Sequence, residues 1–322
     1  MRSFLIRRLL QTIPVLLGVS ALTFLLMQLA PGDFVTLMGQ NPGVNAATLE
    51  EMRHRFGLDQ PWYWQYLLYL RNLMFHLDLG ESLTRHQPVV VVLREALGNT
   101  LILASAAAVV TWGLAIPLGV WAAASRGGLT DRVVSLAAAF ALAVPELLSG
   151  LFLLLLAAHT GWFPVGGMHS AGWDEMGALA RAGDLARHLM LPAVVVGAVP
   201  LASRLRQMRA SMLDVLGLEY VTAARARGVP EQRVLFRHAL RNALNPMISM
   251  FGLTLGALVS GSFIAEVVFS WPGLGRVTVE ALLAEDPYLV MGALLMSTVV
   301  LVAGNLTGDL LLRLADPRLR DA

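Results

Sequence analysis

Three carboxylates stand within or at the edges of long apolar stretches of this sequence: Glu146, Glu266 and Asp309. A carboxylate at the centre of a bilayer costs about 2.5–3.5 kcal/mol on insertion scales, so such a group is expected to face the bundle interior or water. Glu146 lies near the middle of its stretch and follows Pro145, which removes a backbone donor there. Irregular backbone at that depth predicts a water-accessible chamber, in which Glu146 meets a cationic group. We treat all three as candidate residues of a pathway through the membrane, although Glu266 and Asp309 would also suit the membrane interface.

The sequence offers little for other site chemistry. It contains no Cys and no Lys, which excludes thiol nucleophiles, zinc–thiolate sites, Schiff bases and the lysine of a P-loop. The seven His residues include no pair at metal-ligand spacing, and neither Gly-x-Ser-x-Gly nor His-Glu-x-x-His occurs. We therefore expect no catalytic residue, no metal and no cofactor in this chain. If ATP is used, another subunit must bind and hydrolyse it.

A basic segment of 28 residues, Glu219–Pro246, lies between two apolar stretches. Its first part predicts a short helix that ends at Gly228 in a left-handed conformation, and Pro230 suits the first turn of a second helix. In that second helix apolar and basic side chains each repeat at intervals of four, namely Phe236, Leu240, Leu244 and Arg233, Arg237, Arg241. Two ordered helices exceed what a simple turn requires, so the segment indicates a docking surface. The arginine row alone would equally suit anionic lipid headgroups.

The composition places these features in a membrane protein. Of 322 residues 56% are hydrophobic and 14% charged, and the mean hydropathy is +0.64. A spanning helix needs about 20 mainly apolar residues. Six stretches fit, the third interrupted at Pro145: Leu9–Ala30, about Leu101–Ala124, Val133–Ala158, about His188–Leu205, about Met247–Phe269 and Tyr288–Leu312. The predicted fold is an all-α integral membrane bundle of six helices.

The arginines predict which side each loop occupies. They concentrate at the N-terminus, between residues 126 and 132, between 204 and 241, and at the C-terminus. The positive-inside rule makes that side cytoplasmic and places both termini there. We expect a transmembrane helix at 1–30, an extracytoplasmic subdomain at 31–96, a transmembrane core at 97–312 that contains the inner loop 211–246, and a cytoplasmic tail at 313–322.

The segment Glu219–Pro246 resembles the EAA loop of ABC importer permeases, in particular the dipeptide/oligopeptide/nickel branch. Further stretches in the expected order also resemble that branch, and they cover nearly the whole chain: Pro31-Gly32-Asp33, Gly57-Leu58-Asp59-Gln60-Pro61, Asp78-Leu79-Gly80-Glu81-Ser82, Gly161-Trp162-Phe163-Pro164, Trp271-Pro272-Gly273-Leu274-Gly275 and Asp316-Pro317-Arg318. In the EAA loop the matching residues that would couple to an ATPase are Tyr220, Thr222, Ala223, Ala224, Arg225 and Gly228.

The resemblance implies a transmembrane subunit of an importer in the bacterial inner membrane. Such subunits pair with a second homologous permease, with two ATP-hydrolysing subunits and with an extracytoplasmic substrate-binding protein. The EAA helix would sit in a groove of an ATPase, where Ala223 and Ala224 allow close approach and Arg225 and Arg227 meet acidic or carbonyl groups. This chain departs from the family pattern at Thr222, where Glu is usual outside this branch.

Several alternatives stay open at this stage. Within the branch, the substrate could be nickel, glutathione or another small solute rather than di- or oligopeptides. A self-contained channel or secondary carrier would explain the spans but not the docking segment. An intramembrane enzyme is disfavoured because its motifs are absent.

The predicted sidedness can be tested directly, because the native chain contains no cysteine. A single cysteine introduced at Gln60 should react with a membrane-impermeant maleimide added outside intact cells, and one placed within 211–246 should react only after permeabilisation. Labelling of the Gln60 position from the cytoplasmic side alone would overturn the predicted topology.

Overall fold

The computed structural model describes residues 2–29, 49–51, 54 and 59–315, and most of these residues are helical. The motifs predicted at 31–33 and 316–318, and residues 57 and 58 of the one at 57–61, lie outside the described residues. The chain divides into two compact units, one comprising Met1–Asn99 with Pro272–Val300 and the other Thr100–Trp271 with Leu301–Ala322. The long helices α5 (Val89–Ala124) and α15 (Pro287–Ala315) contribute to both units.

The predicted helical membrane fold is confirmed. Five helices among the described residues are long and apolar enough to cross a membrane, and a bent pair brings the number to six if that pair is one span. The spans include α1 (Arg2–Leu29), α5, α8 (Ala178–Leu216) and α15, together with α12 (Asn245–Gly261) followed by α13 (Phe263–Val268). Two helices run well past their predicted bounds, since α5 begins at Val89 and α8 ends at Leu216.

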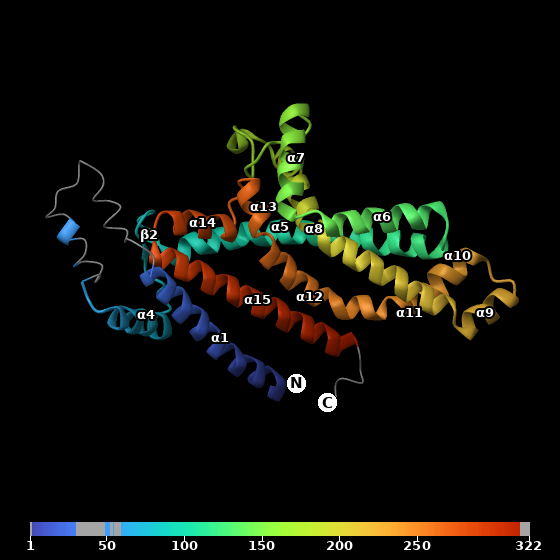
Figure 1. The fold of residues 1–322 in the computed structure, drawn as a ribbon, viewed down its shortest axis with the longest axis horizontal. Helices are drawn as coiled ribbons and strands as arrows, with labels where there is room; N and C mark the ends of the chain where they lie inside the picture. The colour runs from blue at the N-terminus through green and yellow to red at the C-terminus, as the bar shows by residue number, and fades with distance from the viewer. Residues whose placement is uncertain (1, 30–48, 52–53, 55–58, 316–322) are drawn as a thin grey trace. The chain divides into compact units, whose positions relative to one another are not determined.

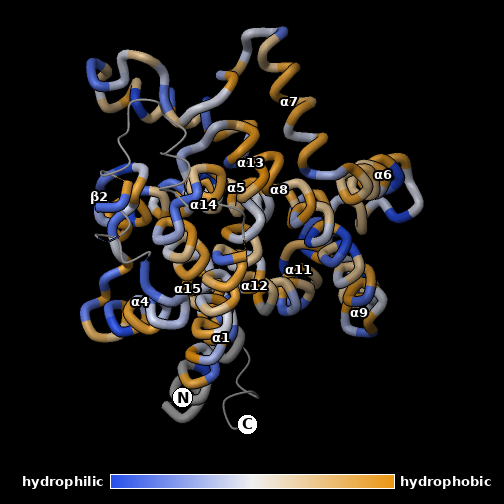
Figure 2. The backbone as a smooth tube through the Cα atoms, turned by 60° about the vertical axis from the view of Figure 1, so that its left-hand side comes forward, coloured by the Kyte–Doolittle hydropathy of each residue, from blue (hydrophilic) through white to orange (hydrophobic). Residues whose placement is uncertain are grey.

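The third predicted span is two helices, α6 (Leu129–Ala143) and α7 (Glu146–Thr160), which meet at 105°. Val144 is extended, with φ −85° and ψ 124°, as expected for a residue that precedes proline. Because Pro145 donates no hydrogen bond, the ladder of α6 stops there and α7 starts afresh. Figure 1 shows α6 beside α8, with α7 turning steeply away, and Figure 2 shows that α7 is hydrophobic over most of its length.

In the first unit a buried aspartate joins a small hairpin to a helix end. The hairpin pairs β1 (Glu81–Ser82) with β2 (Gln87–Pro88) in antiparallel register. Asp286 Oδ2 accepts hydrogen bonds from Ser82 Oγ (2.7 Å), Thr84 Oγ1 (3.0 Å) and the Thr84 amide (3.1 Å). Its Oδ1 accepts from the Leu289 amide at 3.1 Å, so Asp286 is also the N-cap of α15.

The core of this unit forms where α4 (Trp62–His76), the first turns of α5, α14 (Leu274–Leu283) and the first turns of α15 bury their apolar sides. Gly80, with φ +87°, reverses the chain before the hairpin. A Cβ atom there would come within 2.8 Å of the Tyr288 ring, so both conformation and space require glycine.

The second unit packs α5, α6, α8, α12, α13 and the end of α15. A bidentate ion pair joins Arg209 of α8 to Asp131 of α6, with N–O distances of 2.6 and 2.8 Å, and Asp131 also accepts from the Gly127 amide. Helices α12 and α15 cross at two small-xxx-small pairs, Gly252 with Gly256 and Gly304 with Gly308. A Cβ atom on Gly252 would overlap the Gly308 backbone, so any side chain at this crossing would push the helices apart.

Replacing Asp286 tests whether its carboxylate holds the hairpin and the start of α15 together. Asp286→Ala leaves the buried Ser82 hydroxyl and the two Thr84 donors without their acceptor and removes the α15 N-cap. We expect a loss of about 3 kcal/mol and a fall in the thermal midpoint of about 5–10 °C, followed by tryptophan fluorescence in detergent. The exposed Asp174→Ala should change stability by less than about 0.5 kcal/mol. A wild-type melting curve for Asp286→Ala would contradict the assigned role.

Candidate functional site

The predicted docking helix is present as α9 (Glu219–Ala226), and it ends in a Schellman turn. The Gly228 amide donates to the Arg225 carbonyl (2.9 Å), and the Val229 amide donates to the Ala224 carbonyl (3.3 Å). Gly228 has φ +78°, which confirms the predicted left-handed residue. Pro230 lies one residue outside its predicted place, because it is the N-cap of α10 (Glu231–Arg233) rather than part of its first turn.

Helix α9 has one buried face and one exposed face. Val221 and Ala224 are buried, while Tyr220, Thr222, Ala223 and Arg225 are exposed. Of the two alanines expected at a partner's groove, only Ala223 faces outward. Ala224 is three residues after Val221 and therefore shares its inward side, where a small residue lets α9 lie close to the rest of the chain.

Arg225 is held within the loop rather than left for a partner. Its guanidinium binds the Glu231 carboxylate through two hydrogen bonds, of 2.6 and 3.1 Å. These hydrogen bonds hold the pKa of Glu231 below its usual range. The pair therefore adds stability above the ordinary carboxyl pKa of about 4.3, and this contribution is lost as the pH falls through the lowered value. Arg227 is exposed and has no ion pair within the described part of the chain.

A second link joins α9 to the following helices, η2 (Val234–Ala239) and α11 (Leu240–Ala243). The Tyr220 hydroxyl accepts a hydrogen bond from Asn242 Nδ2 at 2.7 Å and donates to the His238 carbonyl at 3.3 Å. Together with the Arg225–Glu231 pair, this contact fixes α9 against the rest of the loop at both ends. The loop is thus built as one connected piece.

The helix predicted after Pro230 contains a π-turn, since η2 has i→i+5 geometry. The buried side chains follow at intervals of five, four and four residues: Val234, Ala239, Ala243 and Met247. The predicted apolar row through Phe236 is therefore wrong at its first member, because the wider turn rotates Phe236 outward to 61% exposure. Leu240 and Leu244 pack partly against the core as expected.

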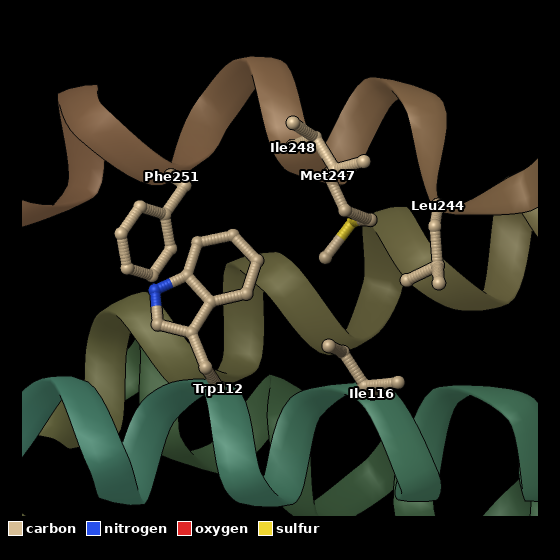
Figure 3. Close-up of a pocket in the computed structure, with 6 residues that line it drawn as sticks. All are labelled: Trp112, Ile116, Leu244, Met247, Ile248 and Phe251. Atoms are coloured by element: carbon tan, nitrogen blue, oxygen red, sulfur yellow. The ribbon is translucent and has the colours of Figure 1, made fainter. Parts of the chain in front are cut away.

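The inward row of this segment packs on α5 and α8 of the second unit. Ala239, Ala243 and Met247 form one cluster with Val120, Ala123, Met208 and Met212. Directly beyond the cluster, an apolar cavity of about 280 Å³ separates Trp112 and Ile116 of α5 from Leu244, Met247, Ile248 and Phe251 at the start of α12 (Figure 3). The Trp112 and Phe251 rings lie 5.3 Å apart and close one end of it. The first turns of α12 thus follow the loop directly and also line the cavity.

The three membrane carboxylates have different surroundings. Glu146 is the first residue of α7 at the break, and its buried Oε1 has no hydrogen-bond partner among the described residues. Glu266 is 0% exposed, and its Oε1 accepts hydrogen bonds from Thr100 and Ser262, each of 2.8 Å. Asp309 is half-buried near the end of α15. The structure does not bring the three together into one cluster; it leaves Glu146 at a helix break and places Glu266 in a packed interior.

Comparison with known proteins explains the arrangement. Residues 115–321 match the family described as binding-protein-dependent transport system inner membrane component, and residues 1–104 match the N-terminal membrane component of such systems. The chain belongs to this family. It is accordingly a permease of a binding-protein-dependent ABC transport system.

Curated relatives of this permease match along its whole length. It is 38% identical to the oligopeptide transport system permease protein AppB of Bacillus subtilis and 39% identical to the di/tripeptide transport system permease protein DppB of Pseudomonas aeruginosa. It is 35% identical to the dipeptide transport system permease protein DppB of Escherichia coli. Each match covers 99% of both chains.

A solved structure shows the same fold at lower sequence identity. A chain of the MetNI methionine ABC transporter, in an inward-facing conformation, matches with a TM-score of 0.56 and 19% identity. The match covers 70% of this permease and 97% of that chain. At this identity the likeness concerns the fold alone.

Sequence reasoning missed two residues that hold the loop together. Glu231 follows the Gly228–Pro230 turn, and a carboxylate six residues after Arg225 across a tight turn was a usable signal for the ion pair. Asn242 lies in the segment that resembles the EAA loop. Its hydrogen bond to Tyr220 depends on the π-turn, which the periodicity of the sequence does not predict.

The left-handed turn provides a test of the loop. Gly228→Val places a β-branched side chain at φ +78°, where the Cβ atom of such a residue costs about 1–2 kcal/mol, so the Schellman turn should open and displace α9. We expect normal expression but a fall of about tenfold or more in transport-linked ATP hydrolysis by the assembled complex, measured in proteoliposomes.

Gly228→Asn is the matched control, because asparagine tolerates the left-handed region and the space around residue 228 is open. It should retain most of the coupled hydrolysis. Unchanged, substrate-stimulated hydrolysis and uptake in Gly228→Val would count decisively against the docking role of α9.

Proposed function

We propose that this chain is a permease subunit of an ATP-driven importer of di- and oligopeptides in a bacterial inner membrane. It would form the translocation pathway with a second, homologous permease. Two ABC ATPase subunits would bind and hydrolyse ATP, and an extracytoplasmic binding protein would deliver the peptide. In this proposal the chain itself catalyses no reaction and holds no cofactor.

The full-length similarity to permeases named for oligopeptide, di/tripeptide and dipeptide transport carries the choice of substrate. It favours peptides over nickel and the other small solutes of the branch. Helix α9, which ends in a Schellman turn, supports the coupling role, since a channel or secondary carrier does not require an ordered docking loop.

Coupling would pass from α9 to the membrane through the described contacts. The Arg225–Glu231 and Tyr220–Asn242 links make α9 move together with α10, η2 and α11. α12 starts immediately after α11, and its first turns supply one wall of the apolar cavity. A displacement of α9 by an ATPase would therefore shift that wall relative to Trp112 and Ile116.

Glu146 is the pathway residue that this proposal favours. Its unpartnered oxygen lies at the 105° bend between α6 and α7, the only bend of more than 40° within a candidate span among the described residues. A peptide amino group or an arginine of the second permease would supply the missing cation. Glu266, whose carboxylate already joins Thr100 to Ser262, is assigned to packing.

Uptake by the reconstituted complex tests the function. The permease, its second permease, the ATPases and the binding protein are placed in liposomes that contain ATP, and radiolabelled di-, tri- and pentapeptides are added outside with nickel and glutathione as rival substrates. The proposal expects ATP-dependent accumulation of peptide. Accumulation of nickel or glutathione alone, or peptide entry that needs no ATPase, would reject it.

The same assay examines the pathway residue. Glu146→Gln removes the negative charge while keeping the size of the side chain, so we expect an assembled complex with peptide uptake lowered about tenfold. Ser149→Ala is the control, because it deletes only a hydroxyl that bonds to the Glu146 carbonyl. Wild-type uptake of several unrelated peptides in both Glu146→Gln and Glu146→Ala would make Glu146 a tolerated structural group.

A further inference from the structure

A polar cavity of about 230 Å³ lies in the first unit, between the beginning of α5 and α14. Its floor is apolar and buried, and it is formed by Val92 and Ala96 of α5 and by Val277 of α14. Asn99, whose side-chain amide donates to the Pro272 carbonyl at 2.9 Å, closes one end. The pathway and the coupling loop described above use none of these residues.

Charged side chains make up the walls of this cavity. Glu280 binds Arg85 of the hairpin at 2.8 Å and Arg276, one turn earlier on α14, at 2.7 Å. One carboxylate thus holds two arginines, and it fixes the hairpin side of the cavity to α14. All three side chains remain between 37% and 44% exposed, so an incoming group can reach them.

The fourth charged wall residue, Glu95, is different. It is exposed, and within the described residues it has neither a hydrogen bond nor an ion pair. Two arginines and two glutamates give the cavity a formal charge of zero, but the only charge without an opposite partner is negative. A complementary group is therefore a cation.

The size of the cavity restricts what that cation belongs to. It exceeds the ~150 Å³ that admits benzene in an engineered protein core, so one long side chain fits. It falls below the ~300 Å³ at which pockets for whole drug-sized ligands begin, so a peptide does not. A lysine or arginine would lay its methylene stem on Val92, Ala96 and Val277 and bring its charged head to Glu95.

We propose that this cavity receives a basic side chain of the extracytoplasmic binding protein. The inference rests on the proposed function, which supplies that partner, and on the predicted topology, which places the hairpin and α14 on the outer side. Charge at such a rim acts mainly by raising the association rate and by selecting the partner. The cavity would thus fix the position of the binding protein on this permease.

Two substitutions that change the charge of the cavity in opposite directions, Glu95→Gln and Arg85→Gln, test the proposal. The assembled complex in nanodiscs is titrated with purified, fluorescently labelled, peptide-loaded binding protein, and association and dissociation are followed at several salt concentrations. Glu95→Gln should lower the affinity about three- to tenfold, chiefly through slower association, and should flatten the salt dependence. Arg85→Gln, which leaves Glu280 paired with Arg276 and changes the formal charge of the cavity from zero to minus one, should raise the affinity about twofold or more.

Glu175→Gln is the matched control, since Glu175 is an exposed glutamate in the other unit, in the short helix η1 (Trp173–Glu175), and no ion pair engages it in the described chain. It should bind as the wild type does. A higher affinity for Glu95→Gln together with a lower affinity for Arg85→Gln would show an anionic partner group, and affinities within twofold of wild type for both variants would show that nothing docks there. Either result overturns the proposal. Failure of the proposed function would look different, because the wild-type complex itself would then neither bind the protein nor import peptide.

Discussion

A bilayer offers no water to the backbone, and this constraint shapes the whole chain. Every amide and carbonyl at membrane depth needs a partner within the protein, so the chain crosses in long helices and departs from them only where the break is covered or lines a space. The described residues show this at Pro145, where α6 gives way to α7, and at Ser262, whose hydroxyl bonds both to the Val259 carbonyl and to Glu266. Charge follows the same logic, since Glu266 is buried only with two hydroxyl donors beside it.

Helix α8 is long enough to extend from the membrane to the loop. Its 39 residues give about 58 Å at 1.5 Å per residue, almost twice the ~30 Å hydrocarbon core. The helix must therefore project from the bilayer at one end or both, and its last turns carry Met208 and Met212, on which the loop packs. The loop contributes small alanines to that contact, and the adaptable methionines fill the remaining space. Such a surface permits close packing and small adjustments at once.

The sequence predicted the features that depend on a local property of the chain. The length of the apolar stretches located the spans, Pro145 located the break, and Gly228 located the left-handed turn. It did not predict the end of α8 at Leu216. The arginines at 206 and 209 suggested the bilayer boundary but do not stop a helix, and neither proline nor glycine occurs between Arg209 and Gly217. It also missed the burial of Glu266 and the internal use of Arg225, since both depend on residues brought close only by the fold.

The π-turn in η2 has a consequence for how such loops change over time. A helix with one residue too many keeps its contacts on both sides of the wide turn and presents the surplus residue to the outside, as it presents Phe236 here. Deleting one residue between Arg233 and Ala239 would restore an ordinary helix, leaving Ala243 and Met247 in place and withdrawing that outward aromatic. A length difference of a single residue at this point would thus be a neutral event for the fold and a change in what the loop offers to its surroundings. Insertion and deletion, rather than substitution, are then the natural means by which this surface diverges.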